Sequence, residues 1–353
     1  MKLEKMLFVV GNSRSGTTMM GRILGKHSDV YTFGELHFFG QLWSPASSSE
    51  LLHKQEAEKL VAQLFCIQRQ GYRTHGKPSN FLKESRNFLS ELAEFPATPD
   101  HLFSAFLQYE TGRNGKTIPC DQTPRNVFYI DDILRFYPQA KIINMIRDPR
   151  DVLLSQKQKW KRRFLGGTDM PMKETFRDWI NYHPITISRI WRTAVTAADR
   201  FVDNERVISI YFEKLLAHPE TTVSDVCQFI GIDYATAMLQ VPQVGSSVNT
   251  DKPDQLGINP TRANNWQIRQ NMKKSPELPL TKNQRTLSST EIYISQKINR
   301  TLMVKHNYVP ISIRPNILSL VVNVLSFPMK LAAAFVCNLD RIKNIRETLK
   351  RRV

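Results

Sequence analysis

The sequence has few cysteines, and those it has are far apart. The four are Cys66, Cys120, Cys227 and Cys337, and no two of them are separated by only two residues. Zinc sites and dithiol redox sites normally use closely spaced cysteines, so neither is expected. The spacing demands no disulfide either, which favours a reducing compartment such as the cytoplasm.

The chain also lacks a long apolar run near its start. The first such run, MLFVV at residues 6–10, leads straight into a glycine turn. It is too short for the apolar region of a secretory signal peptide, so we interpret it as a strand and expect no signal peptide. No internal repeat or low-complexity tract is visible.

Acidic residues are in deficit. The sequence has 49 Lys and Arg against 32 Asp and Glu, a formal net charge of +17. This charge favours a nucleotide, a nucleic acid or an anionic membrane surface as ligand. A length of 353 residues with 41% hydrophobic residues allows one large α/β domain with an appendage, or two small domains.

Short apolar runs alternate with stretches of helical periodicity. The predicted strands are residues 6–10, 29–33, 141–146 and 207–212, and the predicted helices are 17–26, 50–70, 100–110, 175–202, 219–230 and 289–305. The alternation predicts an α/β fold, a P-loop-like three-layer sandwich whose central, mainly parallel sheet is flanked by helices.

Three segments depart from this pattern and define the predicted domain organisation. Residues 41–115 contain an insertion that shapes the acceptor site, with a loop-rich part at 71–99. Residues 242–283, rich in Pro, Asn, Lys and Ser, are predicted to form a mobile lid loop. The main domain is predicted to span residues 1–310, with a separate tail at 311–353.

The motif GNSRSGTT at residues 11–18 follows a predicted strand and precedes a predicted helix. Glycine lets backbone approach an anion closely, and the N–H groups of a helix start bind phosphate oxygens. Arg14, Thr17 and Thr18 add donors. The glycine spacing matches the nucleotide-hydrolase P-loop GxxxxGK[ST], but Thr17 stands where the lysine should be, which argues against ATP or GTP hydrolysis.

A second anion site is predicted in RDPRDVLLS at residues 147–155. Arg147 follows a strand directly, and Ser155 lies about two turns along the helix that Pro149 opens, so both can face the same end of the sheet. An arginine and a hydroxyl suit a phosphate monoester. Asp148, Arg150 and Asp151 are instead interpreted as a salt-bridged helix start.

Together the two motifs resemble those of the sulfotransferases that use 3′-phosphoadenosine 5′-phosphosulfate (PAPS), with local similarity to the tyrosylprotein branch. The resemblance implies that PAPS is the co-substrate and that no metal is required. It also implies site residues. The 5′-phosphosulfate would contact Arg14, Ser15, Gly16, Thr17 and Thr18; the 3′-phosphate, Arg147 and Ser155; and the adenine, Tyr211. Ser246 or Ser247 would lie near the reacting sulfate, and the lid contacts would be Lys252, Arg262 and Trp266, although Trp266 is equally interpreted as a packing anchor.

One further motif only partly fits the family. CDQTPRNVFYI at residues 120–130 is similar to a Thr-Pro motif in which lysine usually precedes the threonine. Gln122 stands at that position here, so the role of that lysine is not carried over.

A general base is expected at the end of the second strand, in TFGELHFF at residues 32–39. The resemblance implies that Glu35 accepts the acceptor's proton, because the tyrosylprotein branch has a glutamate there. His37 is the rival, since the cytosolic branch employs histidine from another part of its chain. The remaining alternative is that Glu35 caps a helix or pairs with Arg14.

Two basic regions remain. We interpret KQKWKRR at 157–163 as a solvated face beside an anionic cofactor rather than a nucleic-acid site, because no array of stacking aromatics accompanies it. In the tail, ILSLVVNVLSF at 317–327 and LAAAFVC at 331–337 precede a basic end. The alternatives are a helix lying in an anionic membrane interface, packing on the domain or on a dimer partner, and a membrane span.

The sequence therefore predicts a PAPS-dependent sulfotransferase that acts on a hydroxyl or amine of an unidentified carbohydrate, lipid, peptide or metabolite. The alternatives are a P-loop-like nucleotide kinase and a non-enzymatic basic protein that binds membranes or polyanions. A cytoplasmic location, peripheral at the membrane, and a homodimer are further expectations.

Overall fold

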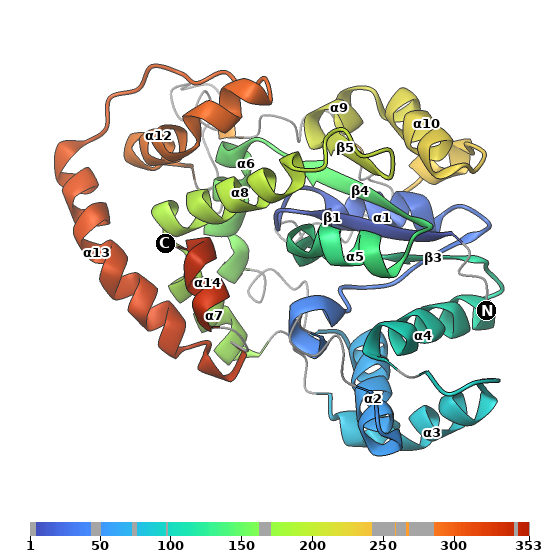
Figure 1. The fold of residues 1–353 in the computed structure, drawn as a ribbon. Helices are drawn as coiled ribbons and strands as arrows, with labels where there is room; N and C mark the ends of the chain where they lie inside the picture. The colour runs from blue at the N-terminus through green and yellow to red at the C-terminus, as the bar shows by residue number, and fades with distance from the viewer. Residues whose placement is uncertain are drawn as a thin grey trace.

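The computed structural model of the chain describes residues 5–43, 51–72, 76–96, 98–161, 171–241, 258, 266–267, 286–341 and 345–352. Its centre is a five-stranded sheet of order β2-β3-β1-β4-β5, in which every pairing is parallel (Figure 1). The strands are β1 (Met6–Gly11), β2 (Val30–Thr32), β3 (Ile118–Asp121), β4 (Ala140–Ile146) and β5 (Val207–Tyr211). The predicted α/β fold with a parallel sheet is confirmed.

The central strand β1 is apolar throughout because it is covered on both faces. Leu7 and Val9 belong to one core cluster, and Phe8 and Val10 belong to another. The helices that cover the first face are α1 (Thr17–Gly25), α9 (Phe212–Ala217) and α10 (Pro219–Ile230); the second face is covered by α4 (Pro99–Arg113), α5 (Ile130–Phe136) and α8 (Pro184–Asp199). Alternating side chains of one buried strand thus serve two cores.

One predicted helix was wrong, and two elements were missed. The stretch 71–99 is not only loop, because it contains helix α3 (Leu82–Glu91), which packs on α2 (Lys54–Gln70). The predicted helix 175–202 is two helices, α7 (Met172–Asn181) and α8, since Pro184 cannot continue the hydrogen-bond ladder of a preceding helix. Strand β3 was not predicted.

The last helices of the chain pack outside α6 (Pro149–Lys157), α7 and α8 rather than on the sheet. Helix α6 follows β4, and α12 (Ser289–Lys305) packs on α6 and α8. In the tail, the two apolar runs form one helix, α13 (Ile317–Val336), which passes through Pro328. It is followed by α14 (Ile345–Arg352), which returns to pack on α8 (Figure 1).

Candidate active site

The two predicted anion motifs meet at the carboxyl end of β1. Strand β1 lies between β3 and β4. The chain first adds β2 and β3 on one side of β1 and later adds β4 and β5 on the other side. In open parallel sheets, ligands bind at such a reversal of strand order. The GNSRSGTT loop leaves β1 there, and Arg147 follows β4 beside it.

The loop of residues 11–18 has a backbone that only certain residues permit. Gly16 has φ 98° and Arg14 has φ 78°. A side-chain carbon at Gly16 would collide with the ring of Phe212, so glycine is required by both conformation and space. Backbone of this alternating type turns N–H groups toward one side and makes a concavity that suits an anion.

The loop also places polar side chains where an anion could use them. Ser15 Oγ is buried and has no hydrogen-bond partner among the residues that the structure describes. Thr17 is buried and Thr18 is exposed, both in the first turn of α1, where backbone N–H groups have no intrahelical acceptor. A buried hydroxyl without a hydrogen-bond partner costs free energy, which favours a bound ligand oxygen that accepts a hydrogen bond from it.

A direct contact joins the two motifs. Arg14 Nε donates to Ser155 Oγ at 2.9 Å, and Arg147 Nη1 donates to the Arg14 carbonyl at 3.3 Å. The sequence placed Arg14 at one end of a nucleotide and the pair Arg147 and Ser155 at the other. In the structure these three residues lie together, at one edge of the sheet.

Arg147 is held rigidly in this edge. Its guanidinium lies 4.4 Å from the centroid of the Phe212 ring and 3.8 Å from Asp151, and its carbonyl accepts from the Trp191 indole at 2.9 Å. Burial raises the pKa of Asp151 to about 7, although the Arg147 charge opposes the shift. The arginine is therefore preorganised for an anion.

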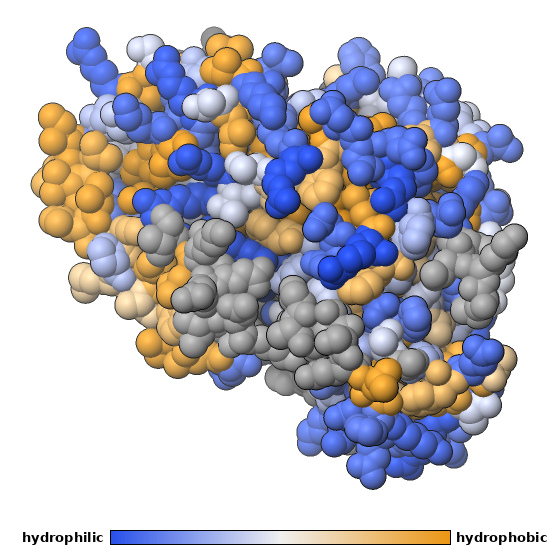
Figure 2. Space-filling model, viewed as in Figure 1, coloured by the Kyte–Doolittle hydropathy of each residue, from blue (hydrophilic) through white to orange (hydrophobic). Residues whose placement is uncertain are grey.

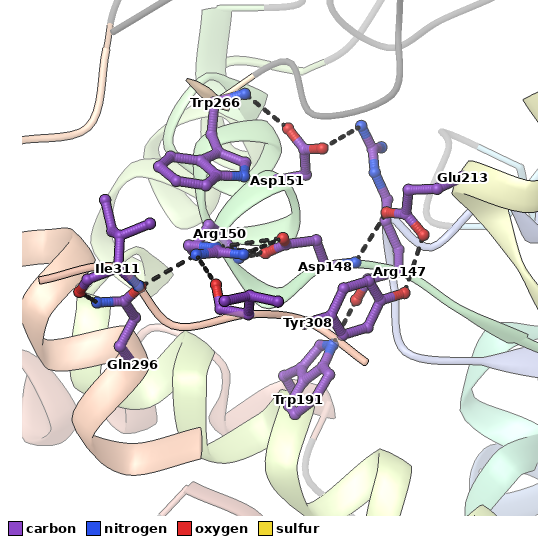
Figure 3. Close-up of polar contacts among 11 residues, drawn as sticks. Arg147, Asp148, Arg150, Asp151, Trp191, Glu213, Trp266, Gln296, Tyr308 and Ile311 are labelled. Atoms are coloured by element: carbon purple, nitrogen blue, oxygen red, sulfur yellow. Dashed lines mark hydrogen bonds and ion pairs between the residues drawn. The ribbon is translucent and has the colours of Figure 1, made fainter. Parts of the chain in front are cut away.

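At the start of α6 the predicted ion pair forms between Asp148 and Arg150, whereas Asp151 lies nearer Arg147 of the anion site. Asp148 caps the helix by accepting from Arg150 N at 2.8 Å, and the Arg150 side chain bonds both carboxylate oxygens of Asp148 (Figure 3). Arg150 also reaches Gln296 of α12 at 3.0 Å, and lies 4.1 Å from the Trp266 ring centroid. These contacts fasten α12 and Trp266 to α6.

A second carboxylate, on α9, links that helix to this edge. Glu213 accepts from Asp148 N at 3.0 Å and from the Tyr308 hydroxyl at 2.9 Å (Figure 3). Burial, the largest influence, raises the pKa of Glu213. Trp266 N donates to Asp151 at 2.9 Å, so Trp266 is a packing anchor in this structure.

Glu35 and His37, proposed as rivals for the role of base, are partners. His37 Nε2 lies 3.0 Å from Glu35 Oε2, and the His37 ring stacks on Tyr72 at 3.8 Å. The Glu35 side chain is 44% exposed and therefore only partly buried. Burial favours a higher pKa for Glu35, but the hydrogen bond and charge of His37, with the charges of Lys159 and Arg14, outweigh it and lower the pKa.

A buried carboxylate behind Glu35 was missed by the sequence analysis. Asp121 ends β3 and accepts hydrogen bonds from Thr123 Oγ1 and Asn126 Nδ2, both at 2.8 Å. Burial raises its pKa to about 7, against these hydrogen bonds. Thr123 Oγ1 in turn lies 3.4 Å from His37 N, so the cluster supports the loop that carries Glu35. The pattern Asp-x-Thr at a strand end was the available signal.

The other predicted site residues divide into two groups. The Tyr211 hydroxyl lies 3.1 Å from His306 Nδ1, at the end of α12, so its contact with adenine stays a prediction. Ser247, Lys252 and Arg262, with most of the predicted lid, lie outside the described residues.

The basic stretch at the end of α6 forms ion pairs with neighbouring helices. Lys157 pairs with Glu291 and Lys159 with Asp178, each at 2.7 Å, so this part of the stretch is ion-paired rather than only solvated. Within the part of the chain that the structure describes, no group of three or more His, Cys, Asp or Glu side chains could hold a metal ion.

The sequence is similar to those of known protein-tyrosine sulfotransferases. A candidate protein-tyrosine sulfotransferase of Caenorhabditis briggsae is 24% identical over 238 residues, which cover 67% of this chain and 69% of that protein. Protein-tyrosine sulfotransferase 1 of Danio rerio is 22% identical over 244 residues, covering 66% of this chain and 55% of that protein.

Solved structures show a looser likeness. The sulfotransferase domain of the Synechococcus PCC 7002 olefin synthase has a TM-score of 0.47 and 17% identity, covering 85% of this chain and 94% of that one. The sulfotransferase domain from the curacin biosynthetic pathway has a TM-score of 0.46 and 16% identity, covering 86% of this chain and 98% of that one. The model of the sulfotransferase family matches residues 7–236, and the chain therefore belongs to the sulfotransferase family.

Proposed function

We propose that the protein transfers a sulfuryl group from PAPS to a hydroxyl or amine acceptor by in-line displacement. The observation that carries the proposal is the contact of Arg14 with Ser155 at 2.9 Å, beside Arg147. It unites two anion-binding motifs at one sheet edge, as a nucleotide with phosphates at both its 5′ and 3′ positions requires.

In this proposal the residues of the edge supply charge and position. Arg14 and the N–H groups at the start of α1 neutralise charge on the bridging oxygen as its bond to sulfur breaks and 3′-phosphoadenosine 5′-phosphate leaves. Arg147 and Ser155 bind the 3′-phosphate and fix the donor in line with the acceptor.

Glu35 is the base in this proposal, and His37 positions it. The acceptor oxygen or nitrogen forms its bond to sulfur while its proton moves to the Glu35 carboxylate. The His37 contact at 3.0 Å holds the carboxylate, and the lowered pKa keeps Glu35 ionised at neutral pH. Asp121 and Thr123 support the same loop from behind.

The direct test is calorimetric titration with 3′-phosphoadenosine 5′-phosphate, compared with adenosine 5′-phosphosulfate and ATP. We expect tight binding that requires the 3′-phosphate. Ser155→Ala should weaken it by about 10-fold, the value of one hydrogen bond to a charged group. The control is Ser90→Ala, whose hydroxyl is exposed and bonds only locally to the Asn87 carbonyl.

Other outcomes separate the alternatives. Preference for ATP would support a kinase, and absence of nucleotide binding would support a non-enzymatic basic protein. Once donor binding is established, incubation with labelled PAPS and a native extract identifies the acceptor by the molecule that becomes labelled. Its class, whether carbohydrate, lipid, peptide or metabolite, follows from that experiment.

A further inference from the structure

Helix α13 turns an apolar face away from the domain, although apolar side chains such as Phe327 and Ala334 also line its inner side. Its outward side chains form a face, here called the α13 outer face, made of Leu318, Val321, Val322, Leu325, Met329 and Val336, all exposed. Ser319, Asn323 and Ser326 are instead half-buried. A helix on the surface of a soluble domain normally turns its apolar stripe inward and its polar residues outward, so α13 is built to meet an apolar phase.

The α13 outer face continues onto a neighbouring helix. Helix α7 packs against α13 and exposes Met172, Phe176 and Trp179. The Lys330 ammonium of α13 lies 3.9 Å from the centroid of the Trp179 ring. In Figure 2 the apolar surface extends along the side of the molecule where α13 runs in Figure 1. Contiguous exposed apolar surface of this kind marks a binding site.

By length and composition alone, α13 could cross a membrane. It has 20 residues, and its most apolar window has a mean hydropathy of 1.8 with 6% of its residues buried. A span of that length matches the hydrocarbon core of a bilayer. The geometry of its two ends decides between crossing the bilayer and lying in its surface.

Both ends of α13 are tied to the same domain. At the start, Asn316 N donates to Thr290 Oγ1 of α12 at 3.2 Å. Just after the end, Asp340 accepts two bonds from Arg177 of α7, at 2.6 and 2.7 Å. A helix that crossed a bilayer would carry one of these ends to the far side and break its contacts.

The chain beyond α13 strengthens this restraint. The Arg351 guanidinium of α14 lies 3.8 Å from the centroid of the Phe128 ring, and Arg352 Nη1 lies 3.4 Å from Asn181 Oδ1. Phe128 stands just before α5, which packs beneath the sheet, so the last helix is fastened to the main domain. The segments before and after α13 are therefore both attached to the same domain.

We propose that the α13 outer face and the exposed side chains of α7 dock the protein on an anionic lipid bilayer, with α13 lying in the plane of the interface. Aliphatic side chains would enter the acyl boundary, while Trp179 and Lys330 sit at the headgroup level, as amphipathic side chains do. Lys173 of α7, 71% exposed although 3.8 Å from Asp340, and the exposed Arg314 just before α13 supply positive charge for lipid phosphates.

Lipid fits the surface better than a second copy of the chain does. The outer face carries no hydrogen-bonding side chain, whereas its margin carries lysine, arginine and tryptophan. A net charge of +17 disfavours self-association and favours an anionic surface. The docking proposal does not depend on the proposed transferase activity.

The experiment is flotation of the full chain with vesicles of phosphatidylcholine, with and without phosphatidylglycerol. We expect flotation with the anionic vesicles. Leu325→Glu combined with Met329→Glu should reduce the bound fraction by at least about 10-fold, because both side chains would otherwise bury apolar surface in lipid. The matched control is Val202→Glu, which is equally exposed at 66% but outside the patch.

Two readouts keep the result interpretable. Thermal melting and calorimetric titration with 3′-phosphoadenosine 5′-phosphate should be the same in both variants, because the altered side chains are exposed. Brominated lipids should quench the fluorescence of the wild type, and Trp179→Leu should remove most of that quenching.

Three outcomes would overturn the proposal. One is equal flotation of the double variant and the wild type. Another is a dimer in sedimentation that the double variant abolishes, without vesicle binding, which assigns the surface to a second copy. The third is resistance of the bound protein to extraction by alkaline carbonate, which indicates a membrane span.

Discussion

The carboxyl edge of the sheet and the α13 outer face distribute polarity in opposite ways. At the edge, Ser15 and Thr17 are polar and buried, while on α13 Leu325 and Met329 are apolar and exposed. Each arrangement costs free energy in an isolated, water-soluble domain. Each is therefore understandable when something else completes it, an anion at the edge and an apolar phase at the helix.

The two regions differ in how far their side chains contact the rest of the domain. Side chains at the edge contact elements far apart in the sequence, so their replacement should change both function and folding. Side chains of the α13 outer face contact little else in the domain, so their replacement should change binding alone. The predictions below test this difference, from the largest expected effect to the smallest.

The largest effect is expected for Glu35→Gln, which keeps the shape of the side chain but removes its basicity. Turnover should fall by about 10²- to 10⁴-fold, the contribution of a positioned base. Affinity for 3′-phosphoadenosine 5′-phosphate should stay within about 2-fold, because uncharged Gln still accepts from His37. Steady-state rates and calorimetry measure the two quantities. Near-normal turnover with normal donor binding would rule out Glu35 as the base, and Glu94→Gln on the exposed surface is the control.

Gly16→Ala should lower the free energy of unfolding by about 3 kcal/mol, through strain at a positive φ and a collision with the buried Phe212 ring. Urea unfolding measures the change. The matched control is Gly112→Ala in α4, where a side-chain carbon meets nothing within 4 Å, and it should be neutral or stabilising. Equal midpoints for the two variants would contradict the strained loop geometry.

Asp121 should make stability depend on pH. Burial raises its folded pKa to about 7, so between its unfolded value near ~4 and pH 7 the native state holds a proton that the unfolded state has lost. Stability therefore falls as pH rises through this window, by up to about 1.4 kcal/mol per pH unit, and levels off above it.

Asp121→Asn cannot titrate, so the difference in slope between wild type and variant isolates this carboxyl. Urea unfolding at several pH values between about 4 and 8 measures it. Parallel stability curves for the two proteins would show that Asp121 ionises at its ordinary pKa. Asp151 has a similar raised pKa and contributes the same slope to both proteins, so it cancels.

A smaller effect is expected for His37→Phe, which preserves ring stacking on Tyr72 but removes the hydrogen bond to Glu35. Without that bond and charge, two of the influences that lower the pKa of Glu35 are lost, so its pKa rises relative to the wild type. The acidic limb of the pH profile of kcat/KM should therefore move to higher pH, because a base with a higher pKa stays protonated, and so inactive, up to a higher pH. An unmoved limb would mean that His37 does not tune Glu35.

The smallest effect is expected on α13. Leu325→Ser should change the free energy of unfolding by no more than about 0.5 kcal/mol, because the side chain is 69% exposed. Phe327→Ser, two residues away, should cost about 1–2 kcal/mol, since that ring contacts His183 and Arg189. Thermal unfolding compares them. A large loss at Leu325 would show that the outer face already packs within the domain.

Much of the sheet could be predicted because it is central. The apolar runs of β1 and β4 are continuous, since both faces of these strands are covered. Strand β3 has only four residues and contains Pro119, so it carries neither the length nor the composition of a strand. The helical periodicity of α7 runs on into α8, which concealed the break before Pro184.

The sequence predicted many residues of the candidate site but not which of their side chains are in contact. Arg14, Arg147 and Ser155 were identified from motifs that follow strands, but the sequence does not specify which side chains touch. Glu35 and His37 were weighed as rivals because spacing of two residues in a loop has no fixed geometry. The Asp121 cluster carries no charge pair and no glycine turn, and so gave little signal.

The contact between Arg14 and Ser155 ties the site to the assembly of the whole domain. The two residues are 141 positions apart in the chain, so the cradle exists only after β4 and α6 have joined β1. A ligand that touches both recognises the assembled sheet and not its fragments. At about 100 times its dissociation constant, such a ligand would raise the free energy of unfolding by about 2.7 kcal/mol. The melting temperature would then report ligand concentration, and a nascent chain that ends before α6 would have no such affinity.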